Sequence, residues 1–384
     1  MPKQQRNANR MGSIRKRADG RWEGRYTDPV GRQRSVYGKT QKEVAAALRQ
    51  IQRDMDTGSW IEPNRMTLSE WIDTWLTDYA ENTDKTRAYY RRICTLYVLP
   101  ILGDLRLSAL TSLHIRRMLR QLQGRKGDDA LSSTTVAQAL AVLRIALNRA
   151  MGAKLIATNP ANDVPLPKKE KTQMHIIDRP MIPDFVTAAQ RTHYPEALIL
   201  LLQTGLRSGE LRGLTWDDID EAHSTLYVRH QLDLSKAGSP ALRPPKDNSS
   251  RAIVVGPEVL ATLKAQRRSL AEHRLKAGAA WRDGPFAEAL VVRTIYGNPM
   301  DAKTLYRAVK TVSEAMDVPG LHPHDLRHSY AVAALRAGAD IKTVQHNLGH
   351  ATAKMTMDVY AAYTTDAAQA AAAKMSAYWT DATN

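Results

Sequence analysis

Six polar side chains in the second half of the chain are of the types needed for chemistry at a phosphate ester. Guanidinium groups stay charged at any working pH and form paired hydrogen bonds to phosphate oxygens. A tyrosine phenol, with an ordinary pKa of about 10, needs to lose its proton as it attacks. Imidazole and ammonium groups can carry out the proton transfers of such a reaction. The candidates are Arg207, Lys246, His324, Arg327, His350 and Tyr360.

Local patterns place these candidates at the ends of predicted elements. Arg207 follows the apolar stretch 195–202, for which the sequence predicts a helix. His324 and Arg327 open another predicted helix, and their spacing of three puts both on one helical face. Gly349 predicts a helix stop or a turn shortly before Tyr360.

Each candidate taken alone also fits an ordinary structural role. Arg207 has Glu210 three residues further on, with which it could form a surface ion pair. A histidine at a helix start is commonly a capping or packing residue. Tyr360, between Val359 and Ala361, would by default be half-buried core. The order and completeness of the set favour the catalytic interpretation.

The segments that carry these residues resemble those of the tyrosine recombinases, the phage integrase family. The family pattern T-G-L-R-x-x-E-L matches residues 204–211, H-x-L-R-H matches residues 324–328, and L-G-H-x9-Y matches residues 348–360. Residues 100–103, 110–111 and 159–160 resemble the family's helical core-binding domain, and the basic first sixty residues resemble its arm-binding domain. The resemblance therefore covers almost the whole chain.

The resemblance implies DNA cleavage and rejoining by an Arg–Lys–His–Arg–His–Tyr set. Arg207 and Arg327 would hold the phosphate oxygens, which gain negative charge as an alcohol attacks. Tyr360 would be the nucleophile, with His324 as base or phosphate donor and His350 as a second donor. A phosphotyrosine link conserves the bond energy, so the resemblance implies no ATP, metal or other cofactor.

The resemblance also implies a role for Lys246 and for three supporting residues. Lys246 lies between two predicted strands and resembles the family's hairpin lysine, which protonates the departing 5′ oxygen. The family usually has Thr where this chain has Asp247. Glu210, Asp325 and His328 are expected to orient their neighbours rather than touch phosphate.

Two other motifs are weaker. Residues 324–328 nearly match the zinc motif H-E-x-x-H, but Asp325 replaces the Glu and Arg327 would bring positive charge to the metal. A metalloprotease is therefore a remote alternative. Residues 38–40 suggest a phosphate loop, but Gln33 stands where its first glycine should be, so a strand end before a helix cap is favoured.

Composition supports a polyanionic partner. The 384 residues include 55 Lys and Arg against 39 Asp and Glu, a net charge of +16. Residues 1–60 hold 14 basic and 6 acidic residues, or +8. A single cysteine, Cys94, excludes an intramolecular disulfide and Cys-based zinc fingers and fits a reducing cytoplasm. The first ten residues lack the apolar segment of a secretory signal, and residues 197–202 are too short to span a membrane.

The first sixty residues predict three strands and a helix. The strands are expected at 13–17, 21–26 and 32–37, with a tight turn at Asp19-Gly20, and a capping box at 40–43 opens a helix to about residue 56. Because strand side chains alternate, several arginines should share one face that binds nucleic acid. These are Arg15, Arg17, Arg21 and Arg25, with Arg32 and Arg34 extending the face.

The rest of the chain predicts a helical unit and a mixed unit. Helices are expected from a capping box at 67–70, at 85–99 ending before Pro100, at 112–122 and at 133–151, where an apolar stripe indicates core. A Pro- and Lys-rich linker follows, in which Lys168, Lys169 and Lys171 either contact a phosphate backbone or are solvated. The mixed unit has short strands at 224–229, 251–255 and 290–293 and a helical tail at 366–378.

We therefore predict a multidomain α+β protein: a three-stranded sheet plus helix (1–60), an all-α core-binding domain (66–163), a linker (164–171) and a mainly α catalytic domain with a small antiparallel sheet (172–384). The expected function is integration or excision of a phage or other mobile element by a recombinase. It would act as a homotetramer on double-stranded DNA with core and arm sites, with possible DNA-bending accessory proteins, in the bacterial cytoplasm and away from membranes. The alternatives are a chromosome-dimer resolvase, a type IB topoisomerase and, more remotely, a DNA-binding regulator without catalysis.

Overall fold

The computed structural model describes residues 13–58, 60–62, 64–79, 83–167, 174–234, 240–246, 249–284 and 286–350, together with residues 352, 357 and 375–376. The chain divides into two compact units, Met1–Lys171 and Thr172–Asn384. Tyr360, the linker lysines Lys168, Lys169 and Lys171, and all but two residues of the predicted tail helix lie outside the described residues. Among the described helices, none is long and apolar enough to cross a membrane.

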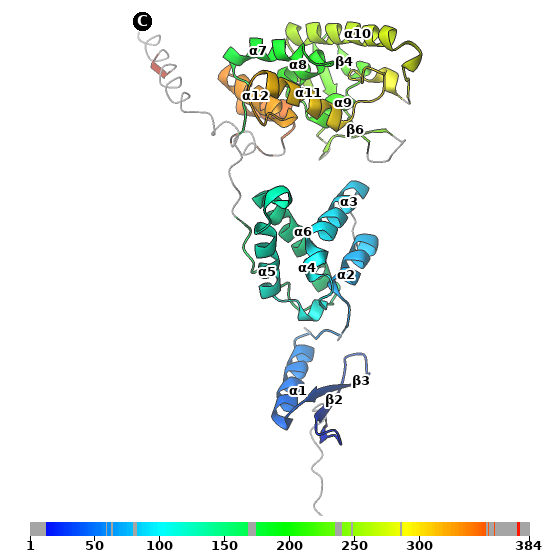
Figure 1. Ribbon diagram of the computed structural model, residues 1–384, viewed down its shortest axis with the longest axis vertical. Helices are drawn as coiled ribbons and strands as arrows, with labels where there is room; N and C mark the ends of the chain where they lie inside the picture. The colour runs from blue at the N-terminus through cyan, green and yellow to red at the C-terminus, as the bar shows by residue number, and fades with distance from the viewer. Residues whose placement is uncertain are drawn as a thin grey trace, which may run out of the picture. The chain divides into compact units, whose positions relative to one another are not determined.

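The N-terminal region is an antiparallel sheet with one helix packed on it (Figure 1). The predicted elements are confirmed to within about a residue, as β1 (Ile14–Lys16), β2 (Trp22–Thr27), β3 (Gln33–Gly38) and α1 (Gln41–Asp56). Gly20 turns the first hairpin with φ +83°. A Cβ at Gly24 would lie 2.6 Å from Val44 Cγ1, so a glycine lets α1 approach the sheet this closely.

The register of the sheet corrects one prediction. Arg15 pairs with Glu23, and Arg25 with Ser35, so these arginines share a face. Arg34 instead pairs with Tyr26, and it lies on the face that carries Gly24 and α1. The prediction that Arg32 and Arg34 extend the arginine face was wrong, because the turn after Asp28 sets the opposite alternation. Both side chains form ion pairs with Glu62.

An acid lies among the arginines of the exposed face. The Glu23 side chain is 4% exposed and accepts hydrogen bonds from Arg15 Nε at 2.6 Å and Ser35 Oγ at 2.8 Å. It also forms a longer contact with Arg25. These bonds, above all the one from Arg15, lower the pKa of Glu23 to about 2. Arg21, next to the turn, is paired with Asp19.

The second region of the first unit, from about residue 64 to 167, is built of helices in the part that the structure describes. Its helices are α2 (Leu68–Thr74), α3 (Asp84–Ile93), α4 (Leu99–Leu102), α5 (Ser112–Gln123) and α6 (Ser133–Gly152), with π-helical turns at Trp75–Tyr79 and Cys94–Val98. The predicted capping box of Thr67 and Glu70 is present. Trp71 is buried and donates its Nε1 hydrogen to the Ala146 carbonyl at 2.9 Å. The predicted stripe on α6 is confirmed as core.

One helix runs further than predicted. The sequence placed its end before Pro100, whereas helical structure continues through α4 to Leu102. The wider π-helical turn at Cys94–Val98 comes directly before α4, and Pro100 occupies the first turn of α4, where a missing N–H costs no helical hydrogen bond. The helix ends at Gly103, whose N–H donates to the Leu99 carbonyl.

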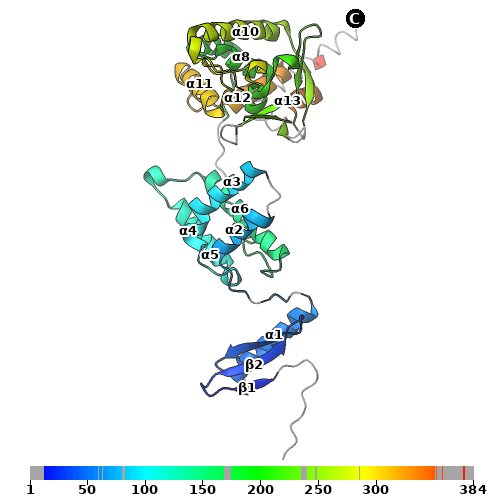
Figure 2. The same ribbon diagram turned by 90° about the vertical axis from the view of Figure 1, so that its right-hand side faces the viewer.

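The second unit is built around the apolar helix α8 (Pro195–Thr204). This helix packs against α7 (Ile182–Ala189), α10 (Pro257–Ala277) and α12 (Pro323–Arg336) (Figures 1 and 2). The described residues also form α9 (Ser208–Gly213), α11 (Ala302–Ala315) and α13 (Ile341–Leu348). Single 3-10 turns occur at Leu107–Ala109, Gly127–Asp129, Arg179–Met181, Trp216–Asp218, Gly278–Ala280 and Ala287–Ala289.

Short antiparallel strands flank these helices. One sheet has the order β4 (Ile219–Asp220), β5 (Thr225–Val228), β8 (Arg251–Val254), and β6 (Gln231–Asp233) pairs with β7 (Ala241–Arg243). The predicted strands at 224–229 and 251–255 are thus confirmed. The predicted strand at 290–293 forms only isolated bridges, because Leu290 pairs with Thr215 while Arg293 turns back through Gly297 to pair with Pro299.

Candidate active site

Arg207 is placed by a glycine at the end of α8. Gly205 caps α8 with φ +63°, and a Cβ there would lie 2.5 Å from the Tyr330 ring, so both its backbone and its surroundings require glycine. The chain then enters α9, where the Arg207 N–H donates to Glu210 Oε2 at 2.9 Å. Arg207 Nη1 donates to Glu210 Oε1 at 2.6 Å, and its Nη2 to the Gly349 carbonyl.

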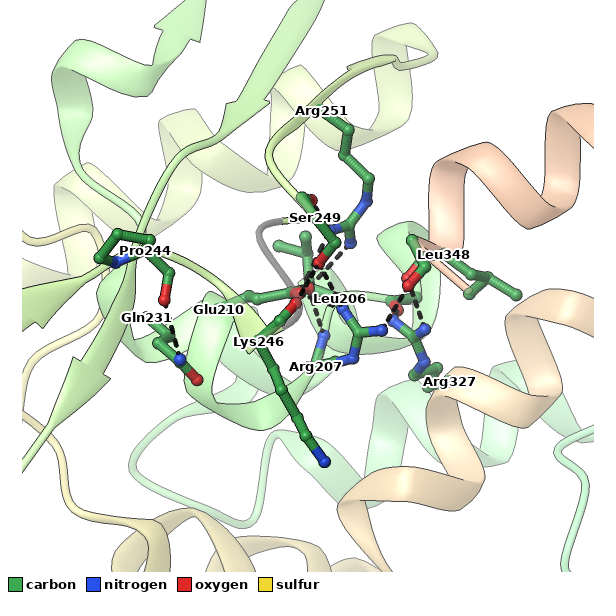
Figure 3. A network of polar contacts seen from close by, with 12 residues as sticks. Leu206, Arg207, Glu210, Gln231, Pro244, Lys246, Ser249, Arg251, Arg327 and Leu348 are labelled. Carbon is green, nitrogen blue, oxygen red and sulfur yellow. Dashed lines mark hydrogen bonds and ion pairs between the residues drawn. The ribbon is translucent and has the colours of Figure 1, made fainter. Parts of the chain in front are cut away.

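Arg327 approaches the same place from α12. Arg327 is 2% exposed, and its Nη1 donates to the Gly205 carbonyl at 2.7 Å. Its Nη2 donates to the Leu348 carbonyl, while its buried Nε has no hydrogen-bond partner among the described residues. Burial, with the positive charge of Arg207 nearby, lowers the pKa of Arg327 to about 9. Figure 3 shows the two guanidinium groups side by side.

The candidate histidines belong to the same cluster. The rings of His324 and His328 meet edge to face, with centroids 4.4 Å apart. Burial is the main cause that lowers the pKa of His324, and it lowers the pKa of His328 to about 4. Burial, followed by the charges of Arg327 and Arg207, also lowers the pKa of His350 to about 4. The imidazoles are therefore neutral at pH 7, the state in which a histidine can accept a proton.

The other two supporting side chains, Asp325 and Glu210, occupy distinct places. Asp325 caps α12, since its Oδ2 accepts a hydrogen bond from the His322 N–H at 2.8 Å. The Glu210 side chain is 1% exposed and lies between Arg207 and Arg251. Burial alone would raise the pKa of Glu210, but the hydrogen bonds and charge of Arg251, with help from Arg207, lower it below its ordinary value. Glu210 is therefore an ionised, buried partner of two arginines.

Lys246 lies at the edge of this cluster. It is exposed in the connection between β7 and β8, and its carbonyl accepts a hydrogen bond from Ser249 Oγ at 2.9 Å. Ser249 Oγ in turn accepts one from Arg207 Nη1 at 3.2 Å. Within the described part of the chain, the Lys246 amine has no hydrogen-bond or ion-pair partner, and Figure 3 draws it without a contact to either guanidinium.

The structure thus brings together Arg207, His324, Arg327 and His350 from elements far apart in the sequence. A cavity of about 320 Å³ opens beside them, lined by Ser249, Ser250, Arg251, Gln345, His346, Gly349 and His350. Fixed positive charge and neutral imidazoles next to an open cavity suit the binding of a phosphate and the stabilisation of charge that develops on it. Tyr360, the sixth predicted residue, lies outside the described residues.

Sequence reasoning missed Arg251 and Ser249. Arg251 is the first residue of a predicted strand, where an arginine is ordinarily solvated, yet its side chain is 2% exposed. The alternation of buried and exposed residues along β8 puts Arg251 on the buried side. That alternation was the available signal, because it places a charge in the interior that must have a partner.

Comparison with known proteins places the chain in a family. Residues 175–366 match the model of the phage integrase family, and residues 67–123 match the model of the phage integrase N-terminal SAM-like domain. A tyrosine recombinase XerC-like protein of Caldanaerobacter subterraneus subsp. tengcongensis is 27% identical over 370 residues, which cover 88% of this chain and 91% of that protein. The integrase of Mycobacterium phage L5 is 27% identical over 360 residues, covering 90% and 92%.

Two groups of solved structures share the fold. The integrase of transposon Tn1549, in complex with a circular intermediate DNA, superimposes with a TM-score of 0.68 at 21% identity and covers 80% of this chain and 99% of that one. A lambda integrase tetramer bound to a Holliday junction gives a TM-score of 0.55 at 19% identity, with coverage of 92% and 96%.

Proposed function

This chain belongs to the phage integrase family and is a tyrosine-type site-specific recombinase of mobile elements, and we propose that Tyr360 is its nucleophile. The observation that carries this proposal is the convergence of Arg207 and Arg327 on the carbonyls of Gly205, Leu348 and Gly349. Their positive charge is fixed before substrate arrives, so it costs no reorganisation when the reaction begins.

In the proposed reaction, the Tyr360 oxygen attacks a DNA phosphate and the bond from phosphorus to the 5′ oxygen breaks. The product is a 3′-phosphotyrosyl ester and a free 5′ hydroxyl. Attack by a 5′ hydroxyl on this ester reverses the step, reforms the phosphodiester and releases Tyr360, so the bond energy is conserved. Arg207 and Arg327 stabilise the negative charge on the phosphate oxygens during both steps.

Proton transfer is assigned to the neutral histidines and to Lys246. His324 takes the phenolic proton as Tyr360 attacks, and its lowered pKa keeps it neutral for that role. His350 donates a hydrogen bond to the phosphate. Lys246 protonates the departing 5′ oxygen, and its exposed place between β7 and β8 lets it approach a bound DNA strand. Glu210, Asp325 and His328 hold these groups in place.

The substrate and assembly follow from the same proposal. Residues 66–163 and 172–384 would clamp double-stranded DNA at the core site, with the linker lysines of 164–171 on its backbone. Residues 1–60 would bind separate arm sites through Arg15, Arg17, Arg21 and Arg25, and this second contact raises the effective concentration of the distant DNA segment. A homotetramer on DNA, DNA-bending accessory proteins and a location in the bacterial cytoplasm complete the proposal, the tetramer by analogy with the lambda integrase complex.

A covalent adduct on DNA is the direct test. When a core duplex is nicked close to the cleavage position, cleavage releases a short fragment that carries the 5′ hydroxyl and diffuses away. The phosphotyrosyl intermediate cannot then be rejoined, and it should be detected as a covalent adduct on a denaturing gel. Tyr360→Phe should abolish the adduct and keep DNA binding. Tyr306→Phe, an exposed tyrosine of α11, is the matched control and should form adduct at the wild-type rate. An adduct that persists in the Tyr360 variant would reject this nucleophile.

A further inference from the structure

Arg251 is a buried charged residue to which the proposed reaction gives no role. Its guanidinium belongs to the first residue of β8, and Figure 3 shows it next to Glu210 of α9. Toward α9, Nη2 donates to Glu210 Oε2 at 2.8 Å and Nη1 to Glu210 Oε1 at 3.1 Å. Toward the end of α13, Nε donates to the Asn347 carbonyl at 2.7 Å. A charge this deep in the protein is stable only because these acceptors surround it.

The contact of Arg251 with Glu210 determines how much positive charge Arg207 can present to the substrate phosphate. Both oxygens of Glu210 are shared, since Arg207 binds Oε1 through Nη1 and Oε2 through its backbone N–H. Without Arg251, Arg207 would be the one arginine that pairs with the Glu210 carboxylate, in a place with little solvent. Glu210 would then compete with the substrate phosphate for the Arg207 guanidinium. Arg251 divides that charge and leaves Arg207 with net positive charge toward the substrate.

The contact with Asn347 holds the turn that faces the phosphate site. Asn347 lies two residues before Gly349, whose carbonyl accepts from Arg207 Nη2. A Cβ at Gly349 would lie 2.9 Å from Arg251 Nη1 and 3.3 Å from Arg207 Nη1, so both guanidiniums press against this turn. His350 follows directly, and its side chain therefore depends on the same backbone. Arg251 thus connects β8, α9 and the turn that carries His350.

We propose that Arg251 is a positioning residue of the cleavage site: it neutralises part of the Glu210 charge and fixes the Asn347–His350 turn, so that Arg207 and His350 are aligned before DNA binds. This inference rests on the function proposed above. Although Arg251 lines the cavity, it does not itself bind the phosphate in this proposal. Its side chain is only 2% exposed, and Nε, Nη1 and Nη2 all donate to protein oxygens. It acts through Glu210 and through the turn.

The test is single-turnover cleavage of the nicked core duplex at saturating enzyme, with DNA affinity measured separately at the same salt. Arg251→Met should slow cleavage by about 10- to 100-fold while affinity stays within about twofold. A double-mutant cycle with Glu210→Gln then asks whether Arg251 acts through this carboxylate. Once position 210 is neutral there is no charge to divide, so Arg251→Met should cost about threefold or less in that background.

Matched variants separate positioning from loss of a buried arginine in general. Arg293 is also buried in the second unit and is held by Asp283 at 2.6 Å, with no contact to Glu210. Arg293→Met should cleave within about twofold of wild type at temperatures where both variants are folded. Arg251→Lys keeps the charge but cannot bind both Glu210 oxygens and the Asn347 carbonyl, so it should still lose about tenfold.

Three results would overturn the inference. The first is cleavage by folded Arg251→Met or Arg251→Lys at the wild-type rate. The second is an equal loss in the wild-type and Glu210→Gln backgrounds, and the third an equal loss in Arg293→Met. These failures differ from failure of the proposed function, in which the unaltered chain itself would form no adduct.

Discussion

The arginines of the N-terminal sheet and those around Glu210 differ in what surrounds their guanidinium groups. Arg15 and Arg25 have side chains 57% and 43% exposed and share one buried carboxylate, Glu23. Arg251 and Arg327 are almost fully buried and donate to carbonyls and to Glu210. Exposed arginines add affinity that salt can screen, whereas buried ones act through fixed geometry. Under the proposed function, one residue type would thus serve a DNA-binding surface in one region and a reaction site in the other.

The largest effect should come from breaking the fixed geometry. Arg327→Lys removes the fork that reaches both the Gly205 and Leu348 carbonyls, and a lysine cannot reproduce it. We expect cleavage of the nicked core duplex to fall by about 10²- to 10³-fold. Affinity for that duplex at fixed salt should change by less than about threefold. A large loss of affinity with little loss of rate would place Arg327 among the binding arginines instead.

The exposed face should show the opposite response. A triple change of Arg15, Arg17 and Arg25 to Gln should weaken binding to arm-site DNA by about 10- to 100-fold at moderate salt. The slope of log affinity against log salt should become shallower by about three, because each lost phosphate contact releases about one counterion fewer. Cleavage of a core-only duplex should not change. A reduced rate on that duplex would contradict the separation of the two regions.

Acid should destabilise the site region selectively. His328 and His350 have pKa values of about 4 when folded, below the ordinary 6.5, so between these values the unfolded chain binds more protons. The free energy of unfolding should therefore fall as pH is lowered from about 6.5 to 4. Because both rings are partly exposed and screened, we expect on the order of 1 kcal/mol from each. Urea unfolding at several pH values should show that the free energy of unfolding of His328→Gln falls less between pH 6.5 and 4 than that of the wild type.

The smallest expected effect distinguishes the two faces of the N-terminal sheet. Arg34 is held by Asp28 at 2.8 Å on the face that carries α1, whereas Arg25 lies on the exposed face. Arg34→Gln should speed amide hydrogen exchange in β2 and β3 and leave arm-site affinity within about twofold. Arg25→Gln should weaken affinity and leave exchange unchanged. Equal effects of the two changes on affinity would return Arg34 to the DNA-binding face.

Much of the fold could be predicted because its signals are local. Thr67 and Glu70 identify a helix start through bonds between near neighbours, and Gly349 identifies a helix end through one positive φ. The predictions that were wrong concern geometry that is set by residues elsewhere in the chain. Helical structure passes Pro100 because a π-helical turn precedes it, and Arg34 faces α1 because of how its turn closes.

The site divides in the same way. Arg207, His324, Arg327 and His350 could be found from motifs, and the structure brings them into one cluster. Arg251 could not be found from a motif, because its proposed role depends on contacts between α9, β8 and the end of α13. Tyr360 stays a prediction.

The carbonyls that receive Arg327 close two helices. Gly205 caps α8 and Leu348 is the last residue of α13, and carbonyls at helix ends carry partial negative charge. Arg327 therefore ties two helix ends together, and under the proposed reaction the same side chain would bind the phosphate. Replacing this guanidinium should therefore lower the stability of the second unit as well as the proposed cleavage rate.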